Sequence, residues 1–462
     1  KSLEKDWRKA KGSSGFTNFR YYSSSYLSNF SSVDYYWKNN EIINDVLANV
    51  KVEYQGVARQ FSDVMSGIDG VSFQASASSQ TFNYHSYVVS TGNSTVEESN
   101  QLWVVAIDSV TREPELMKNH RSKTLEVLIQ DDNNVLYLIS ATGKVKWSKQ
   151  IEGKIIGEVE QMDIYRNGKW QMLFNTKSNI HLLDINGNEV SGFPFKLKSF
   201  ATNSVNVFDY ENKGNYRFLI CCEDNKIYNF DKNGKLLSDW KYPVLKSHVN
   251  SSIQHFVLQN KDYLFTYDKM GHIYLLDRRG GVRYQPKVSC KPHVSQNFRL
   301  KKGVDIDNTS VVFIDSLNQI ITSLFNGISD TAQIEHSCEV KQCYLSLFEL
   351  GNDNLMYYSL LNNRSLSVYG ADKELLFFEN LDFDVNGNLN VRGKNNKYLV
   401  LADEDAQEIY LYDSDFNPTS VFSVPGSNKT TIGDVNFDGL DDVITITADG
   451  QIIAYSVNFN FN

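Results

Sequence analysis

The segment from Asp434 to Asp442 is where residue types and spacing fit metal chemistry best. It reads Asp-Val-Asn-Phe-Asp-Gly-Leu-Asp-Asp. Oxygen-bearing side chains stand at its first, third, fifth and ninth positions and a glycine at its sixth, which is the spacing of loops that wrap a calcium ion. The alternative is a solvated turn held by its own Asp and Asn side chains. Two other loops, Asp209–Gly214 and Asp382–Gly387, keep the glycine but not the pattern, and we expect no metal there.

The adjacent pair Cys221-Cys222 is the second feature that could carry chemistry. Quinoprotein alcohol dehydrogenases place a vicinal disulfide over their cofactor. Here the pair lies in a strand-like run, Tyr216–Cys222, so one thiol should face a neighbouring sheet and the other should face away. Buried small hydrophobes are the ordinary role of such cysteines. We therefore predict two structural thiols and keep quinoprotein catalysis only as a rival.

Other catalytic signatures are missing from the sequence. It contains no G-x-S-x-G elbow, no H-E-x-x-H and no phosphate loop, and we expect His181 and His272 to be structural. The net charge of −9 argues against a nucleic-acid partner. No run of about 18 apolar residues is present, so no transmembrane helix is predicted. The chain is predicted to be non-enzymatic, without catalytic residues and without any cofactor except one structural calcium ion.

One sequence motif recurs every 43 to 47 residues: a turn, a short aromatic strand, then Asp or Ser. Its clear copies include Asn179–Asp184, Lys226–Asp231, His272–Asp277 and Glu408–Asp413. Each period divides into four short strands, as one propeller blade requires. The sequence predicts an all-β fold, an eight-bladed β-propeller with an N-terminal extension. Seven blades is the fallback if either of the weak units, 278–325 or 326–370, is not a true blade.

The ends of the repeat suggest how the ring closes. The last unit, Thr430–Ser456, has only three strands, while Gln101–Asp108 looks like an outer strand without a sheet. We predict that the strand near Trp103 completes the last blade and so removes exposed edges. Residues 101–462 then form the propeller. Residues 1–100 form a tether and a small β-rich region, which we interpret as part of a longer, missing region.

The repeats resemble two known kinds of propeller. The Asp434–Asp442 loop resembles the calcium loop of FG-GAP and VCBS-type repeats, which implies a carbonyl ligand from Leu440 and four side-chain ligands: Asp434, Asn436, Asp438 and Asp442. The turn glycine Gly143 followed by Trp147 resembles the tryptophan-docking repeats of quinoprotein propellers. Asn186-Gly187 to Phe193 and Asn233-Gly234 to Trp240 echo it. Such repeats occur in pyrroloquinoline-quinone dehydrogenases and in the non-enzymatic propeller lipoprotein of the outer-membrane barrel assembly machinery.

Several longer sequence segments are similar to a poorly characterised family of Bacteroidota envelope proteins. They include Gln161–Tyr165, Gly192–Phe195 and Asn206–Tyr210. The resemblance covers roughly Trp103 to the end. It implies a periplasmic, outer-membrane-associated protein, with the cell surface as the alternative and a lipid anchor left open. Its partners would be other envelope proteins in a membrane-associated complex.

We expect an interaction scaffold of the type IX secretion translocon and its gliding apparatus. The alternatives are a barrel-assembly accessory factor and a quinoprotein-like or carbohydrate-binding propeller.

Overall fold

The chain separates into two compact units, Lys1–Ser99 and Asn100–Asn462, and each is described by itself. The computed structural model describes residues 32–38, 70–77, 82–89, 101–110, 112–288, 298–315, 317, 319–332, 343–350, 355–362, 364–385, 389–393, 396–418 and 424–456. Every element assigned within these ranges is a strand. None of these described segments forms a helix that could span a membrane.

The first unit contains a three-stranded antiparallel sheet. Its strands are β1 (Ser32–Lys38), β2 (Gly70–Ala77) and β3 (Phe82–Val89), and β2 lies in the middle. The β2–β3 ladder runs without a register shift from Gly70 opposite Val89 to Ala77 opposite Phe82. This sheet is therefore an antiparallel meander of its own.

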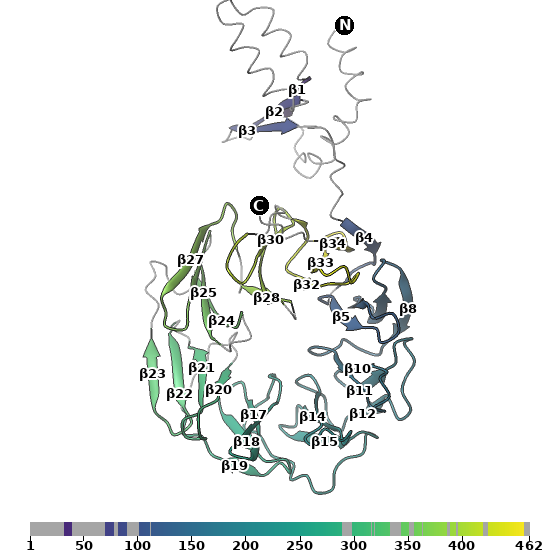
Figure 1. Cartoon of the computed structure of the whole chain (residues 1–462), viewed down its shortest axis with the longest axis vertical. Helices are drawn as coiled ribbons and strands as arrows, with labels where there is room; N and C mark the ends of the chain where they lie inside the picture. The colour runs from purple at the N-terminus through teal and green to yellow at the C-terminus, as the bar shows by residue number, and fades with distance from the viewer. Residues whose placement is uncertain are drawn as a thin grey trace, which may run out of the picture. The chain divides into compact units, whose positions relative to one another are not determined.

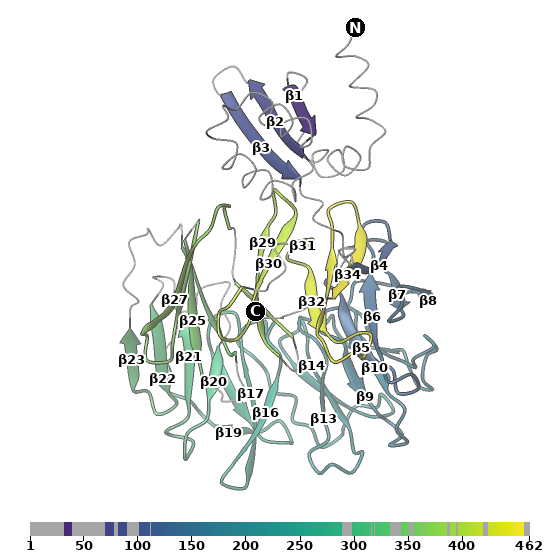
Figure 2. The ribbon, with the colours of Figure 1, turned by 45° about the horizontal axis from the view of Figure 1, so that its top comes forward.

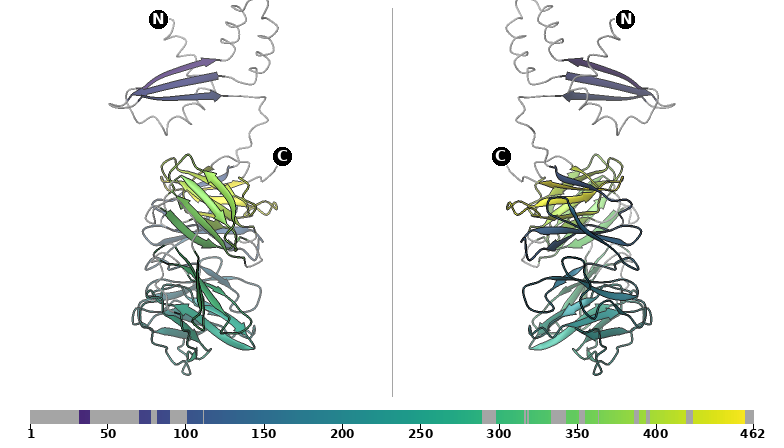
Figure 3. Two further views of the ribbon diagram at one scale, coloured as in Figure 1. Left: turned by 90° about the vertical axis from the view of Figure 1, so that its left-hand side faces the viewer. Right: turned by 90° about the vertical axis from the view of Figure 1, so that its right-hand side faces the viewer.

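The second unit is a ring of eight antiparallel sheets, or blades, numbered here in chain order from β5 (Figure 1). The first strand of each blade lies nearest the axis and the last lies at the rim. The prediction of eight blades is confirmed, because both weak units hold four-stranded sheets, β20–β23 and β24–β27. The blades form a single layer around the axis (Figure 2; Figure 3).

By blade, the strands are β5 (Glu115–Lys118), β6 (Leu125–Gln130), β7 (Val135–Ile139), β8 (Val145–Gln150); β9 (Glu160–Met162), β10 (Gln171–Asn175), β11 (Asn179–Leu183), β12 (Phe195–Lys196); β13 (Asn206–Phe208), β14 (Arg217–Cys221), β15 (Ile227–Asp231); β16 (Gln254–Leu258), β17 (Lys261–Tyr267), β18 (Ile273–Leu276), β19 (Val282–Tyr284); β20 (Arg299–Lys301), β21 (Ser310–Ile314), β22 (Ile320–Leu324), β23 (Ser329–Ala332); β24 (Cys343–Phe348), β25 (Tyr357–Asn362), β26 (Ser365–Tyr369), β27 (Leu375–Asn380); β28 (Asn390–Arg392), β29 (Tyr398–Asp403), β30 (Glu408–Tyr412), β31 (Val424–Pro425); and β32 (Thr430–Gly433), β33 (Asp442–Ile446), β34 (Gln451–Ser456) with β4 (Gln101–Ala106).

The core lies between the blades. Successive side chains of a strand point to opposite faces, and each blade has a neighbour on both faces. The middle strands are therefore buried along their whole length, as in β10, β21 and β33. Their sequences are accordingly near-continuous apolar runs rather than alternating ones.

The ring closes where the sequence predicts. The strand β4 pairs antiparallel with β34, and Trp103 lies opposite Ala454. Arg392 of blade 7 adds a tie across the last blade: its guanidinium donates to the Thr430 carbonyl at 2.9 Å and to Glu113 Oε1 of blade 1 at 2.7 Å. A β-ladder thus joins the strand that precedes blade 1 to the last blade, and Arg392 links blade 7 to blades 8 and 1.

Blade 3 differs from the prediction at its rim. The sequence suggests an outer strand over Leu236–Tyr242, but this sheet has three strands, and the fourth segment makes only isolated bridges, such as Lys226–Val244. Tyr242 has a positive φ of 47°, and Pro243 lacks the N–H that a ladder needs. The segment instead buries Trp240, whose indole N–H donates to the Ile227 carbonyl at 2.7 Å.

Candidate functional site

The predicted calcium loop forms the turn between β32 and β33. Both carboxylate oxygens of Asp434 accept main-chain N–H groups, from Asp438 at 3.1 Å and from Gly439 at 3.0 Å. Asn436 Oδ1 accepts a second bond from the Asp438 N–H, and its amide donates to Asp438 Oδ2 at 2.9 Å. The four oxygen-bearing side chains are therefore brought to one turn, as the spacing predicts, and the turn is held by their own hydrogen bonds.

Two other blades use the same turn without the ligand pattern. Asp163 accepts from the N–H groups four and five residues on, at Asn167 and Gly168. Asp209 accepts likewise from Lys213 and Gly214. The turn at Asp434 is thus the ordinary first hairpin of a blade, and its backbone conformation does not require a metal.

Asp442 distinguishes the turn at Asp434 from the turns at Asp163 and Asp209. It opens β33, its side chain is fully buried, and Oδ2 accepts the Val435 N–H at 2.8 Å, while Oδ1 has no hydrogen-bond partner. Burial, reinforced by the negative charges of Asp438 and Asp434, raises the pKa of the Asp442 carboxyl to about 7. A buried carboxylate of this kind needs either a proton or a cation.

The side chains of the Asp434–Asp442 turn do not form a preformed metal cluster. Over the described ranges, no three His, Cys, Asp or Glu side chains stand close enough together to hold a metal ion. The unpartnered Asp442 oxygen is nevertheless an acceptor of the hard kind that calcium prefers. Calcium at this turn therefore stays a prediction.

The vicinal cysteines are both buried free thiols. Cys221 packs with Leu219 and Leu264 on the side of blade 4, and Cys222 packs with Phe218 and Ile220 on the side of blade 2. Burial raises the pKa of both thiols, that of Cys222 to about 12, so neither is a reactive thiolate. The two side chains fill opposite interblade cores, as strand alternation predicts.

Aromatic residues at the rim join several blades to the next one along the chain. The indole N–H of Trp103 donates to the Ala141 carbonyl at 2.9 Å, and that of Trp147 donates to the Ile185 carbonyl at 3.0 Å. A Cβ added to Gly143 would lie 2.7 Å from Trp103, and one added to Gly187 would lie 2.8 Å from Trp147. Each tryptophan therefore covers the turn glycine of the following blade, not of its own.

The sequence misplaced one member of this series. It assigns Phe193 to the docking position of blade 2, but Phe195 is the residue that covers Gly234, at 2.6 Å from an added Cβ. Phe193 is buried in the core between blades 2 and 3. The extra turn at Ser191-Gly192, where Gly192 has a φ of 91°, moves the strand on by two residues.

His181 is structural, and it replaces a tyrosine of the repeat. In blades 1 and 4 the corresponding residues, Tyr137 and Tyr274, donate to the aspartate that begins the preceding turn, Asp131 and Asp268. In blade 2 that aspartate is absent, and His181 Nε2 lies 3.0 Å from Glu152 on the connection from blade 1. The His272 ring likewise contacts Asp268 at 3.0 Å.

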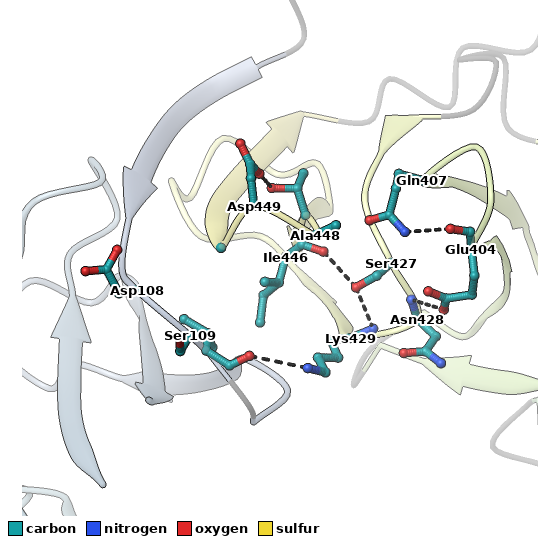
Figure 4. A pocket seen from close by; sticks show the side chains of 13 residues that line it. Asp108, Ser109, Glu404, Gln407, Ser427, Asn428, Lys429, Ile446, Ala448 and Asp449 are labelled. Carbon is teal, nitrogen blue, oxygen red and sulfur yellow. Dashed lines mark hydrogen bonds between the residues drawn. The ribbon is translucent and has the colours of Figure 1, made fainter. Parts of the chain in front are cut away.

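A larger hollow lies where the ring closes. It is open to solvent, has a volume of about 750 Å³, and lies between the turns that end β4, β29 and β33 and the connection into β32 (Figure 4). Its charged lining is Asp108, Glu404, Asp449 and Lys429. Lys429 Nζ donates to the Val110 carbonyl at 3.3 Å and Glu404 accepts the Asn428 N–H at 3.3 Å. This hollow was not predicted from the sequence, because its walls come from both ends of the propeller.

Comparison with known proteins defines the class of fold. No protein-family model and no curated protein matches the chain. A quinohemoprotein alcohol dehydrogenase from Comamonas testosteroni is 10% identical, with a TM-score of 0.50 over 79% of this chain and 78% of that one. BamB from Moraxella catarrhalis is 13% identical, with a TM-score of 0.46 over 78% and 98%. BBS1N, solved in complex with ARL6DN, is 13% identical, with a TM-score of 0.45 over 78% and 98%. The likeness to the dehydrogenase, at a TM-score of 0.50, shows a shared fold alone. The eight blades are defined by the sheets of this structure.

Proposed function

We propose that the chain is a non-enzymatic protein-interaction scaffold, and the observation that carries this proposal is the outer strand of blade 6. Strand β27 pairs with β26 alone among the described strands. Its outward residues Leu376 and Phe378 are 49% and 53% exposed. Apolar side chains beside an open strand edge are typical of surfaces that bind another protein.

The register of the blades distinguishes β27 from β8 and β19 but not from β4, which carries Leu102 at its bulge and Val104 two residues on, 38% and 39% exposed. Strands β8 and β27 share a one-residue bulge at the same place, so Leu376 corresponds to Lys146 and Phe378 to Ser148. In β19, the bulge position holds Arg283. Charged residues at these positions protect an edge from pairing with other chains. Strand β27 keeps an aromatic residue at the docking position, where Phe377 stacks on Phe416 of blade 7. It has no charged residue at its bulge position.

The vicinal cysteines support the non-enzymatic role. In a quinoprotein-type enzyme the pair would have to lie over a cofactor, whereas Cys221 and Cys222 fill two separate apolar cores. The propeller repeats thus supply a rigid ring, and the rim and turns remain for partners.

The setting that we propose follows the sequence resemblance: the periplasmic side of a Bacteroidota outer membrane, in the type IX secretion translocon and its gliding apparatus. Barrel assembly is the alternative machine. The partners would be other envelope proteins.

The experiment compares partner recovery from native membranes in mild detergent. A variant with Leu376→Lys and Phe378→Ser gives β27 the residues that β8 carries at those positions. We expect it to lose an envelope partner that the wild type retains, while Val282→Lys on β19 retains it. Equal recovery by all three proteins, or recovery of no envelope protein, would remove the β27 proposal. Which machine the recovered subunits belong to decides between secretion and barrel assembly.

We also propose one structural calcium ion at the turn of blade 8. Asp434, Asn436, Asp438 and Asp442 would hold it with their side chains and Leu440 with its carbonyl. The support is the spacing of these residues and the unpartnered oxygen of Asp442. The ion would fix the first hairpin of the blade that closes the ring.

A further inference from the structure

A second hollow, of about 350 Å³, lies between the turns of blades 1 and 2. His120 and Arg121 enter it from the turn between β5 and β6, and the Tyr165–Gln171 stretch enters it from the turn between β9 and β10. The Asp184–Ser191 turn of blade 2 supplies the third wall. Two neighbouring blades therefore build this pocket entirely from hairpin turns.

The negative charges in this pocket are engaged by groups of the chain itself, although Glu189 Oε2 is buried without a hydrogen-bond partner. Asp184 Oδ1 accepts the main-chain N–H groups of Asn186 at 2.8 Å and Asn188 at 2.9 Å, and both side-chain amides reach its Oδ2. Glu189 forms an ion pair with Lys149 at 3.5 Å and lies 3.5 Å from the His181 ring.

The positive charges are not satisfied. Arg121 and Lys169 line the pocket, and neither forms an ion pair with any residue in the described part of the chain. The His120 ring adds a free donor. Its Nδ1 accepts the Trp170 N–H at 3.3 Å, so the proton of the neutral ring is on Nε2, which is buried without a partner.

Two further observations agree with a positive local field. Burial, together with the charges of Arg121, Lys169 and Lys123, lowers the pKa of His120. Aromatic surface lies beside these cations, because Tyr165 is 59% exposed and Trp170 also lines the pocket. The pocket lining holds two cations, Arg121 and Lys169, and two anions, Asp184 and Glu189. The anions have partners within the chain, so the two unpaired cations are the groups that would attract an acidic ligand.

We propose that this pocket binds an acidic protein segment, with a Glu or Asp carboxylate on Arg121, Lys169 and His120 and a neighbouring apolar side chain on Tyr165 and Trp170. A guanidinium pairs a carboxylate through two parallel hydrogen bonds, and a lysine adds a point charge. Aromatic rings supply contact area beside the charged group. The inference rests on the proposed interaction role, but it concerns a surface other than β27.

Calorimetric titration with a capped Gly-Phe-Glu-Glu-Phe-Gly peptide tests it at low ionic strength. We expect the wild type to bind this peptide and to bind the matched Gln-Gln peptide at least about tenfold more weakly. Arg121→Glu and Lys169→Glu should each weaken binding by about tenfold or more. Lys213→Glu, an exposed lysine in the corresponding turn of blade 3, should leave affinity within about twofold.

Three results would overturn the proposal: no binding of the Glu peptide, equal binding of the Gln peptide, or equal affinity in the Arg121 and Lys169 variants. A titration with inorganic phosphate is the remaining experiment. Tight phosphate binding that is lost in the same two variants, and that displaces the peptide, would identify a phosphate site instead. If peptide binding fails while the β27 variant still loses its partner, only this inference is wrong and the scaffold role stands.

Discussion

Gln171 in blade 2 and Asp442 in blade 8 occupy the same position of the same turn. Each side chain accepts the N–H of the second turn residue, Ile164 at 2.9 Å and Val435 at 2.8 Å. Gln171 also donates its amide to the Lys169 carbonyl at 2.6 Å, whereas the corresponding oxygen of Asp442 is buried without a partner. The residue that corresponds to Lys169 is Leu440, so a proton or a cation is needed on the side of the Leu440 carbonyl.

Replacing Asp442 by Asn should therefore stabilise the calcium-free protein at pH 8, by roughly 1–3 kcal/mol in the free energy of unfolding. The pKa of Asp442 is raised from 3.8 to about 7 in the folded state. Its contribution to stability is then full below pH 3.8 and is lost as the pH rises through 7. Urea unfolding at pH 5 and pH 8 with chelator measures this. A wild-type stability that falls no more steeply with pH than that of D442N would contradict it.

Calcium should raise the unfolding temperature of the wild type at pH 8, because it would occupy the place of the missing proton. Asp438→Asn should lose most of that increase. Asp209→Asn is the matched control: it alters the same turn in blade 3, so its cost should be equal with calcium and with chelator. If calcium shifts the wild type and D438N alike, the ion does not bind at this turn.

Trp147→Ala should destabilise the propeller by about 2–4 kcal/mol, since it removes a half-buried ring and its bond to Ile185. Gly187→Ala should also destabilise it, because the new Cβ would lie 2.8 Å from the Trp147 ring and Gly187 has a φ of 80°. Gly168→Ala is a useful comparison: its φ is 78°, but nothing lies within 4 Å of the added Cβ. Chemical denaturation of the three variants should rank G187A as more damaging than G168A, and the reverse order would refute the docking role.

Glu152→Gln should remove part of the loss of folding stability that the wild type shows at acidic pH. Partial burial alone would raise the pKa of Glu152, but hydrogen bonds from Thr176 and Asn179 and the nearby His181 lower it from 4.5 to about 2. A lowered pKa stabilises the fold above pH 4.5, and the contribution is lost as the pH falls from 4.5 through 2. The stability difference between wild type and E152Q, followed across that interval, should shrink as the pH falls. A constant difference would show that the charge is not involved.

The propeller itself was determined by local sequence. Strand alternation and turn residues act over a few positions, so the 43–47-residue period, the eight blades and the closing strand at Trp103 could all be predicted. The strand-to-face rule also put Cys221 and Cys222 on opposite faces of their strand, and the structure shows that each face is an interblade core. The prediction was wrong at Phe193, because a two-residue turn cannot be counted from a repeat that varies in length.

The tertiary structure decided what depends on two blades at once. The glycine that Trp147 covers lies 40 residues further on, and the free cations Arg121 and Lys169 share a pocket only because blade 1 stacks on blade 2. The raised pKa of Asp442 likewise follows from burial by neighbours, which residue type does not set. Hydrogen bonds and charge act through space over a few ångströms, and only the closed ring brings these groups within that range.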